Sequence, residues 1–127
     1  VHNIIEYIYL QGIAEGIELL DKKNIDIRKA LAVWKPASVV KSWLIDLALN
    51  AVKKKDFNKI EPSILSVTLD ELIKTKISIN GYTPAFDVAT TIRKESTNKK
   101  NKKFILGKRI ITAIRREFGG HSVNKTL

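Results

Sequence analysis

Apolar residues recur every three or four positions through most of the chain, a spacing that places them on one side of an α-helix. Residues 1–20 form the first such segment, with glutamates between the apolar positions. The positions expected to face a core are Ile4, Ile5, Ile8, Ile13, Ile17 and Leu20. A short second helix is predicted to begin after Asn24 or Asp26, either of which is a good N-cap, and to end near Val33. Pro36 then interrupts the pattern.

The third predicted helix, residues 38–54, is expected to be the central and most buried element. Its apolar positions at helical spacing are Val39, Val40, Trp43, Leu44, Leu47, Ala48 and Ala51. A polar connection is expected to follow at 53–62. Core packing is also the better explanation for Trp34.

Start and stop signals predict three further helices, at 68–79, 83–94 and 104–118. Thr68 and Glu71 have the spacing of a capping box at the start of the first of these. The other signals are Thr83-Pro84 at a start, and Asn80-Gly81 and Gly119-Gly120 at ends. No hairpin turn between alternating strands occurs in the sequence, so the predicted fold is an all-α bundle of about six helices.

Two segments lack a helical pattern. Residues 96–103 are strongly basic and have no apolar residue to anchor them, which predicts a mobile loop. Residues 121–127 are expected to be a tail.

The composition supports one folded domain and excludes several classes of protein. A chain of 127 residues with 44% hydrophobic residues can bury one core, and no apolar run reaches the length of a membrane span or follows a basic N-terminus as in a secretory signal. The absence of cysteine excludes a disulfide framework, a cysteine-containing zinc site and a thiol nucleophile, and no metal site is predicted. The absence of methionine predicts that Val1 is a cut end and that the chain is a fragment.

The net charge of +10 favours an anionic partner, either nucleic acid or a small phosphorylated acid. A second explanation stays open at this point. Lysine, asparagine and isoleucine are all abundant, as expected from an AT-rich genome whatever the function.

Polar residues gather at two places where they suggest chemistry. His2, Asn3, Glu6 and Tyr7 form two i,i+4 pairs on one side of the first helix, where they offer donors and acceptors for a polyhydroxy substrate. The alternative is a solvated face at a helix end. The segment 115–121 combines two arginines, a Gly-Gly pair and a histidine, which suits a phosphate, although cations and glycine are also ordinary features of a helix C-terminus.

These segments resemble one family. Val1–Tyr7 (V-H-N-I-I-E-Y), followed by Gln11 and by 14–16 (A-E-G), resembles the start of the C-terminal domain of 6-phosphogluconate dehydrogenases, whose long helix carries V-H-N-x-I-E-Y. Residues 42–47 (S-W-L-I-D-L) resemble the S-W-L-L-D-L helix of the short bacterial and archaeal type. Other segments in the family's order and near its spacing are 68–71, 84–85 and 113–121.

The resemblance implies an all-α substrate-binding and dimerisation domain over residues 1–127, with the N-terminal nucleotide-binding domain absent from this sequence. It implies a cytoplasmic enzyme of the pentose phosphate pathway. The reaction would be oxidative decarboxylation of 6-phosphogluconate to ribulose 5-phosphate with NADP or NAD, in a homodimer or tetramer. The fragment alone is then expected to be inactive.

The resemblance also implies roles for individual residues. Glu6 would protonate the enediol carbon after decarboxylation, His2 and Asn3 would hold the carboxylate and hydroxyls, and Tyr7 would touch the phosphate. The remaining matches, at positions that family members extend to the neighbouring subunit's phosphate, are Arg115 and His121.

Some features depart from the family's pattern. The family's general-base lysine lies two positions before the residue matching Val1, outside this sequence. Lys41 stands where family members carry a phosphate-contacting arginine, and 63–67 lacks the glycines and the basic residue usual there. Lys35 or a lysine of the 96–103 loop is expected to compensate.

Two other functions compete with this interpretation. One is a basic all-helical nucleic-acid-binding module that uses the 96–103 loop and the arginines of the last helix, although no recognition motif or stacking aromatics accompany them. The other is a purely structural dimerisation domain.

Overall fold

The computed structural model describes residues 1–121 and 123–126, and its helices confirm the predicted all-α fold. Within those residues there is no strand, only one isolated antiparallel bridge between Ile60 and Lys125. A short 3₁₀ helix, η1, spans Phe57–Lys59. The α-helices are α1 (His2–Lys22), α2 (Ile27–Trp34), α3 (Trp43–Lys53), α4 (Leu69–Ser78), α5 (Pro84–Ser96) and α6 (Ile105–Gly119).

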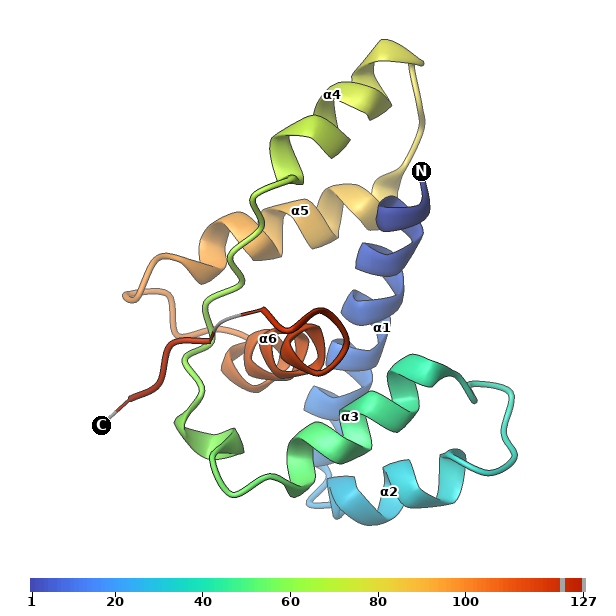
Figure 1. Ribbon diagram of the computed structural model, residues 1–127, viewed down its shortest axis with the longest axis vertical. Helices are drawn as coiled ribbons and strands as arrows, with labels where there is room; N and C mark the ends of the chain where they lie inside the picture. Colours follow the sequence, from blue (N-terminus) through green and yellow to red (C-terminus); the bar gives the residue numbers. More distant parts are fainter. Residues whose placement is uncertain (122, 127) are drawn as a thin grey trace.

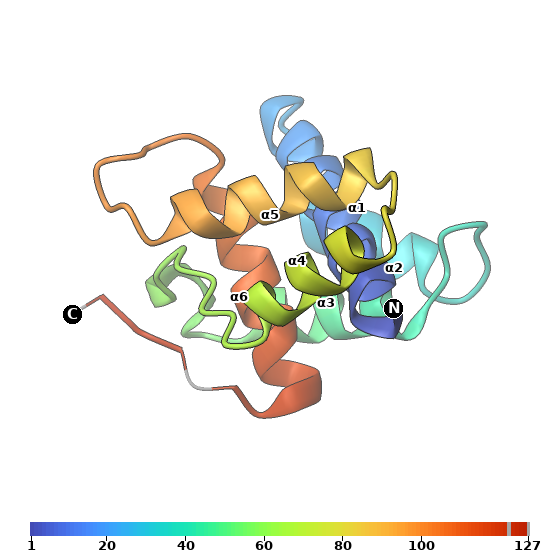
Figure 2. The same cartoon turned by 90° about the horizontal axis from the view of Figure 1, so that it is seen from above.

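The last helix, α6, lies at the centre of the bundle and contacts α1, α3 and α5 (Figure 1). The view from above shows α5 crossing over the molecule (Figure 2). Figure 1 shows α4 at the top, beyond α5, and Leu69 of α4 packs in a small cluster with Tyr7 of α1 and Phe86 of α5. The prediction that the third helix would be central was therefore wrong. Although α3 buries Ile45, Leu47 and Ala48 against α6, it is α6 that buries residues on nearly every side, because it is enclosed by three other helices.

The first helix confirms part of the predicted core row: Ile17 is buried, and Ile4, Ile8 and Ile13 are partly buried against the core clusters. Leu10, Ala14 and Ile17 of α1 enter the main core, and Tyr7 enters a smaller cluster with Phe86 of α5. Ile5, predicted to face the core, is half-exposed. Because α6 and α5 both pack against α1, the buried face turns toward Tyr7 and Leu10 and away from Ile5.

The third helix begins five positions later than predicted, at Trp43. Ser38 and Lys41 form a turn instead, with the Lys41 N–H bonded to the Ser38 carbonyl at 3.0 Å. Ser42 is the true N-cap, because its hydroxyl accepts from the Ile45 N–H at 3.2 Å. Val39 is consequently fully exposed, and the expectation that Val40 and Trp43 belong to the core is also wrong, since both are more than half-exposed.

The capping box predicted at the start of α4 does not form. Thr68 is the N-cap residue, but its hydroxyl makes no cap hydrogen bond and faces the Tyr7 hydroxyl at 3.4 Å. At the start of α6, Glu18 of α1 accepts from the Gly107 N–H at 2.8 Å and satisfies one of the free donors of the first turn. Gly120 ends α6 in the left-handed conformation, with φ of 62°, as its sequence predicts.

The predicted connection and tail contact each other. The described tail residues lie beside 59–61, with the Glu61 N–H bonded to the Asn124 carbonyl at 2.8 Å and the Thr126 N–H to the Lys59 carbonyl at 2.7 Å. The connection is less polar than predicted, because Phe57 and Ile60 are buried. Mobility of the lysine-rich loop stays a prediction. No helix in the described part of the chain is long and apolar enough to cross a membrane.

Candidate functional site

Arg93 of α5 is buried between α1 and the start of α4, and the sequence had not indicated it as a site residue. Arg93 is only 2% exposed, and its guanidinium carbon lies 3.3 Å from the centre of the Tyr7 ring. Its Nη1 donates to the Ser66 hydroxyl at 2.7 Å. Its Nη2 is buried and has no hydrogen-bond partner among the described residues. A buried guanidinium with a free donor is a group prepared for an anion.

The helical spacing of α5 explains how Arg93 becomes buried. Phe86, Ala89, Arg93 and Ser96 share one face of α5, and all four are buried against α1 and the 63–66 segment. Ser96 fixes that segment, because its hydroxyl accepts from the Ile64 N–H at 2.9 Å. A charged residue at a core position of an amphipathic helix was the signal that could have identified Arg93 from the sequence.

A second buried arginine, Arg115, belongs to α6. Arg115 is 8% exposed and lines a cavity of about 170 Å³, and among the described residues it forms no ion pair. The other residues that line this cavity are Ser63, Leu65, Val67, Thr112 and His121. Two of the predicted phosphate-binding residues, Arg115 and His121, therefore lie together.

The two arginines and Glu6 act on one another electrostatically. Burial lowers the pKa of Arg93 and of Arg115, and the positive charge of Arg115 lowers that of Arg93 further. The Glu6 carboxylate opposes both effects, although it forms no ion pair closer than 4.0 Å with either arginine in the described structure. We call Arg93, Arg115, Glu6 and Tyr7 the arginine site. It carries two cations against one acid, which favours an incoming anion.

The first turn of α4 opens beside this site. Ser66 bonds to Arg93 and Thr68 faces Tyr7, so the segment that leads into α4 contacts two members of the arginine site. Free N–H groups and the helix dipole favour a negative charge at such an end. The first turn of α4 also carries the acidic residues Asp70 and Glu71, which oppose an anion there.

The other predicted residues of the first helix are only partly brought together with this site. His2 and Asn3 are exposed in the first turn of α1, where the His2 Nδ1 lies 3.1 Å from the Asn3 Oδ1. Glu6 is half-buried, and Tyr7, far from being part of a solvated face, is 4% exposed. The row thus runs from solvent at His2 into the protein at Tyr7.

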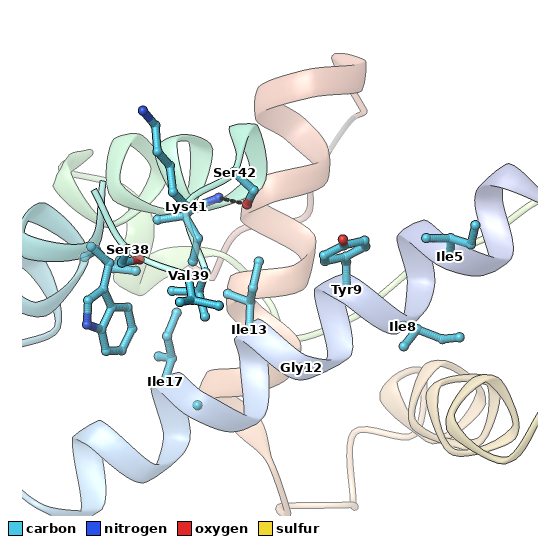
Figure 3. Close-up of a pocket in the computed structure, with 15 residues that line it drawn as sticks. Ile5, Ile8, Tyr9, Gly12, Ile13, Ile17, Ser38, Val39, Lys41 and Ser42 are labelled. Carbon is cyan, nitrogen blue, oxygen red and sulfur yellow. Dashed lines mark hydrogen bonds between the residues drawn. The ribbon is translucent and has the colours of Figure 1, made fainter. Parts of the chain in front are cut away.

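Lys41 lies in a different place from the one predicted for a phosphate ligand. It lines a mainly apolar groove of about 860 Å³ between α1, α2 and the 38–42 segment, which shares no lining residue with the cavity of Arg115 and His121. Figure 3 shows its side chain pointing away from α1. Lys35 is exposed at the end of α2 and lines neither cavity. Lys41 and Arg115 therefore line separate cavities of this chain, and a phosphate contact of Lys41 stays a prediction.

Nothing in the described residues gathers three His, Asp or Glu side chains where they could hold a metal ion. The described residues also contain no strand followed by a glycine-rich loop of the kind that binds a dinucleotide.

Two curated proteins resemble the chain in sequence. It is 30% identical over 129 residues to a Bacillus subtilis (strain 168) protein named "Putative 6-phosphogluconate dehydrogenase YqeC", an alignment that covers 98% of this chain and 42% of that protein. It is 33% identical over 57 residues to "6-phosphogluconate dehydrogenase, NAD(+)-dependent, decarboxylating" of Haloferax volcanii, covering 43% of this chain and 19% of that protein. The chain thus spans less than half the length of each relative.

No protein-family model matches the chain, and no solved structure matches it.

Proposed function

We propose that this chain is the helical, substrate-binding part of an oxidoreductase of the 6-phosphogluconate dehydrogenase type, and that it binds 6-phosphogluconate at the arginine site. The observation that carries the proposal is the free Nη2 of the buried Arg93 next to the unpaired Arg115. The names of the two relatives support the choice of substrate. The phosphate of this substrate matches a site that carries two cations, Arg93 and Arg115.

The phosphate is proposed to bind at Arg93 and Ser66. Arg93 presents the planar donor pair that suits a phosphate, so it takes the place in which Lys41 had been expected. Arg115 and His121 line the adjoining cavity and are proposed to contact the same phosphate. Tyr7 supports the Arg93 guanidinium with its ring.

The sugar-acid end is proposed to lie toward the exposed first turn of α1. His2 and Asn3 would hold the carboxylate and hydroxyls, and Glu6 lies between them and the arginines. Glu6 would deliver a proton to the carbon that has lost carbon dioxide, after hydride transfer to NADP or NAD. The cofactor is proposed to be bound mainly by another domain, and the chain alone is expected not to turn over substrate.

Self-association as a two-fold dimer is part of the proposal. Several large apolar side chains are exposed on separate elements, among them Tyr9, Val39, Trp43, Val67 and Tyr82. Exposed apolar side chains of this size favour an interface in which a second copy or another domain covers them. A cytoplasmic location is proposed on the same family resemblance.

Calorimetric titration with 6-phosphogluconate tests the proposal. We expect binding that weakens as salt rises, because ion pairs with the phosphate are screened, and at least about tenfold weaker binding of gluconate, which lacks the phosphate. Arg28→Met is the control for arginine variants of the site, because Arg28 is exposed on α2 and its removal should leave binding unchanged. Tighter binding of duplex DNA than of 6-phosphogluconate at physiological salt would instead support a nucleic-acid-binding module.

A further inference from the structure

The turn after α6 holds His121 against the end of that helix. Gly120 reverses the chain with a positive φ, and the His121 ring meets the Phe118 ring edge-on at 6.3 Å. A Cβ atom at Gly119 would lie 2.5 Å from the imidazole, so a larger residue there would displace the His121 ring. These contacts place His121 in the wall of the cavity that Arg115 lines.

The chain beyond this turn is fixed to a distant segment. Asn124 and Thr126 pair with the backbone of 59–61, as described above, and Val123 packs against the main core. The turn that carries His121 is therefore anchored on both sides, by α6 before it and by the 59–61 segment after it.

A single carboxylate connects the two anchors. The Asp56 carboxylate accepts from Arg116 Nη1 at 2.8 Å and Nη2 at 3.0 Å, and it also binds Lys125 Nζ at 3.0 Å. Arg116 belongs to α6 and Lys125 to the tail, so Asp56 joins the segments that precede and follow His121. We call Asp56, Arg116 and Lys125 the Asp56 cluster.

We infer that Asp56 is a positioning residue for anion binding: by tying Arg116 to Lys125 it holds the intervening turn so that the His121 imidazole stays in the wall of the Arg115 cavity. The inference rests on the proposed function for the anion, but the position of His121 can be measured without any ligand. A bidentate guanidinium pair fixes direction as well as distance, which suits this role. Without Asp56 the turn loses its link between α6 and the tail.

Nuclear magnetic resonance of the histidine rings tests the position directly. In the ligand-free full chain, the ring protons of His121 should be displaced by the Phe118 ring, and their signal is identified by its loss in His121→Gln. Asp56→Asn should move these signals toward those of a free histidine, and Lys125→Ala, an exposed change that preserves the Arg116 pair, should move them in the same direction by less. Glu117→Gln is the matched control, because it removes the Lys54–Glu117 ion pair of the same helix end without touching the tail. Unchanged His121 signals in Asp56→Asn would overturn the inference.

Titration with 6-phosphogluconate then tests the consequence for binding. Asp56→Asn should weaken binding about threefold and His121→Ala about tenfold, and the double variant should be no weaker than His121→Ala alone. Additive losses would show that Asp56 acts by another route and would overturn the inference. If the wild-type chain binds no 6-phosphogluconate, the proposed function fails, while the histidine signals still decide whether Asp56 positions His121.

Discussion

Arg115 and Arg116 are neighbours in sequence on the same helix, yet they have opposite surroundings. Arg116 points toward Asp56, whose carboxylate accepts from both Nη1 and Nη2. Lys125 completes the cluster around this carboxylate. Arg115 turns toward Tyr7, Glu6 and the buried Arg93, and no carboxylate pairs with either arginine in the described structure. One side of α6 satisfies its charges internally, and the other leaves them available.

The difference separates a cation that is paired with a carboxylate within the fold from cations that we propose bind a ligand. Burying a cation without an acid partner lowers stability, because desolvation is not offset. A chain that keeps two such cations side by side gains nothing structurally from their nearness. The Asp56 cluster therefore stabilises the end of α6, whereas the arginine site is where we propose that an anion from outside the chain binds.

The change expected to separate the two regions most strongly is Arg93→Met. It removes the free guanidinium and should weaken 6-phosphogluconate binding by about 100-fold, since hydrogen bonds to charged groups contribute about 1.5–3 kcal/mol each. The melting temperature of the ligand-free variant should change little, because loss of the Ser66 hydrogen bond and the Tyr7 contact is offset by removal of a buried, unsatisfied charged donor. Calorimetry and thermal melting measure the two effects.

Arg93→Lys is the companion variant. It keeps the charge but loses the planar pair of donors, so binding should fall between that of the wild type and that of Arg93→Met. A fall in melting temperature of several degrees in Arg93→Met, with binding intact, would make Arg93 a structural residue.

Arg116→Met should give the opposite pattern. It breaks the bidentate pair between Arg116 and Asp56, two side chains that are only partly exposed. The free energy of unfolding should fall by about 1 kcal/mol. For a domain of this size the melting temperature should fall by about 4 °C. Binding should weaken only severalfold, through the displaced His121. A loss of binding as large as that of Arg93→Met would erase the distinction between the two sides of α6.

Acid should affect the Asp56 cluster in a predictable direction. Hydrogen bonds from Arg116 and Lys125 hold the pKa of the Asp56 carboxyl well below its usual range. A depressed folded-state pKa stabilises the protein above the unfolded value, about 3.9, and this contribution is lost as pH falls toward the folded value. The melting temperatures of wild type and Asp56→Asn should therefore differ most near pH 7 and converge below about pH 4. A gap that is constant with pH would contradict the role of the ionised carboxylate.

The smallest expected effect is that of Lys41→Ala. Lys41 lies in the apolar groove and points away from α1, so its removal should change 6-phosphogluconate binding by less than about twofold at physiological salt (Figure 3). A tenfold loss in the same titration would return Lys41 to the phosphate site that the sequence had suggested for it.

The helices that have local signals were predictable from the sequence. Asp26 caps α2, Pro84 begins α5 and Gly120 ends α6, all within one turn of the predicted positions, because caps and breakers act on their own neighbours. The start of α3 was not predictable, because Ser38 and Ser42 are equally good caps and tertiary packing decides which of them caps the helix.

The candidate site was only partly predictable for a similar reason. Arg115 and His121 lie close in sequence, and the structure places them in one cavity. Arg93 was missed, since its burial depends on α1 and the 63–66 segment, which are distant in sequence. Tyr7 was placed in a polar row because helical spacing does not show which neighbour covers a face.

The most direct test of the central claim is a crystal structure of this chain with 6-phosphogluconate bound. The account predicts phosphate oxygens at hydrogen-bond distance, about 2.7–3.1 Å, from Arg93 Nη2, with Arg115 and His121 on the same group. A phosphate bound by the lysines of the 96–103 loop or beside Lys41, with Arg93 Nη2 still without a partner, would contradict it.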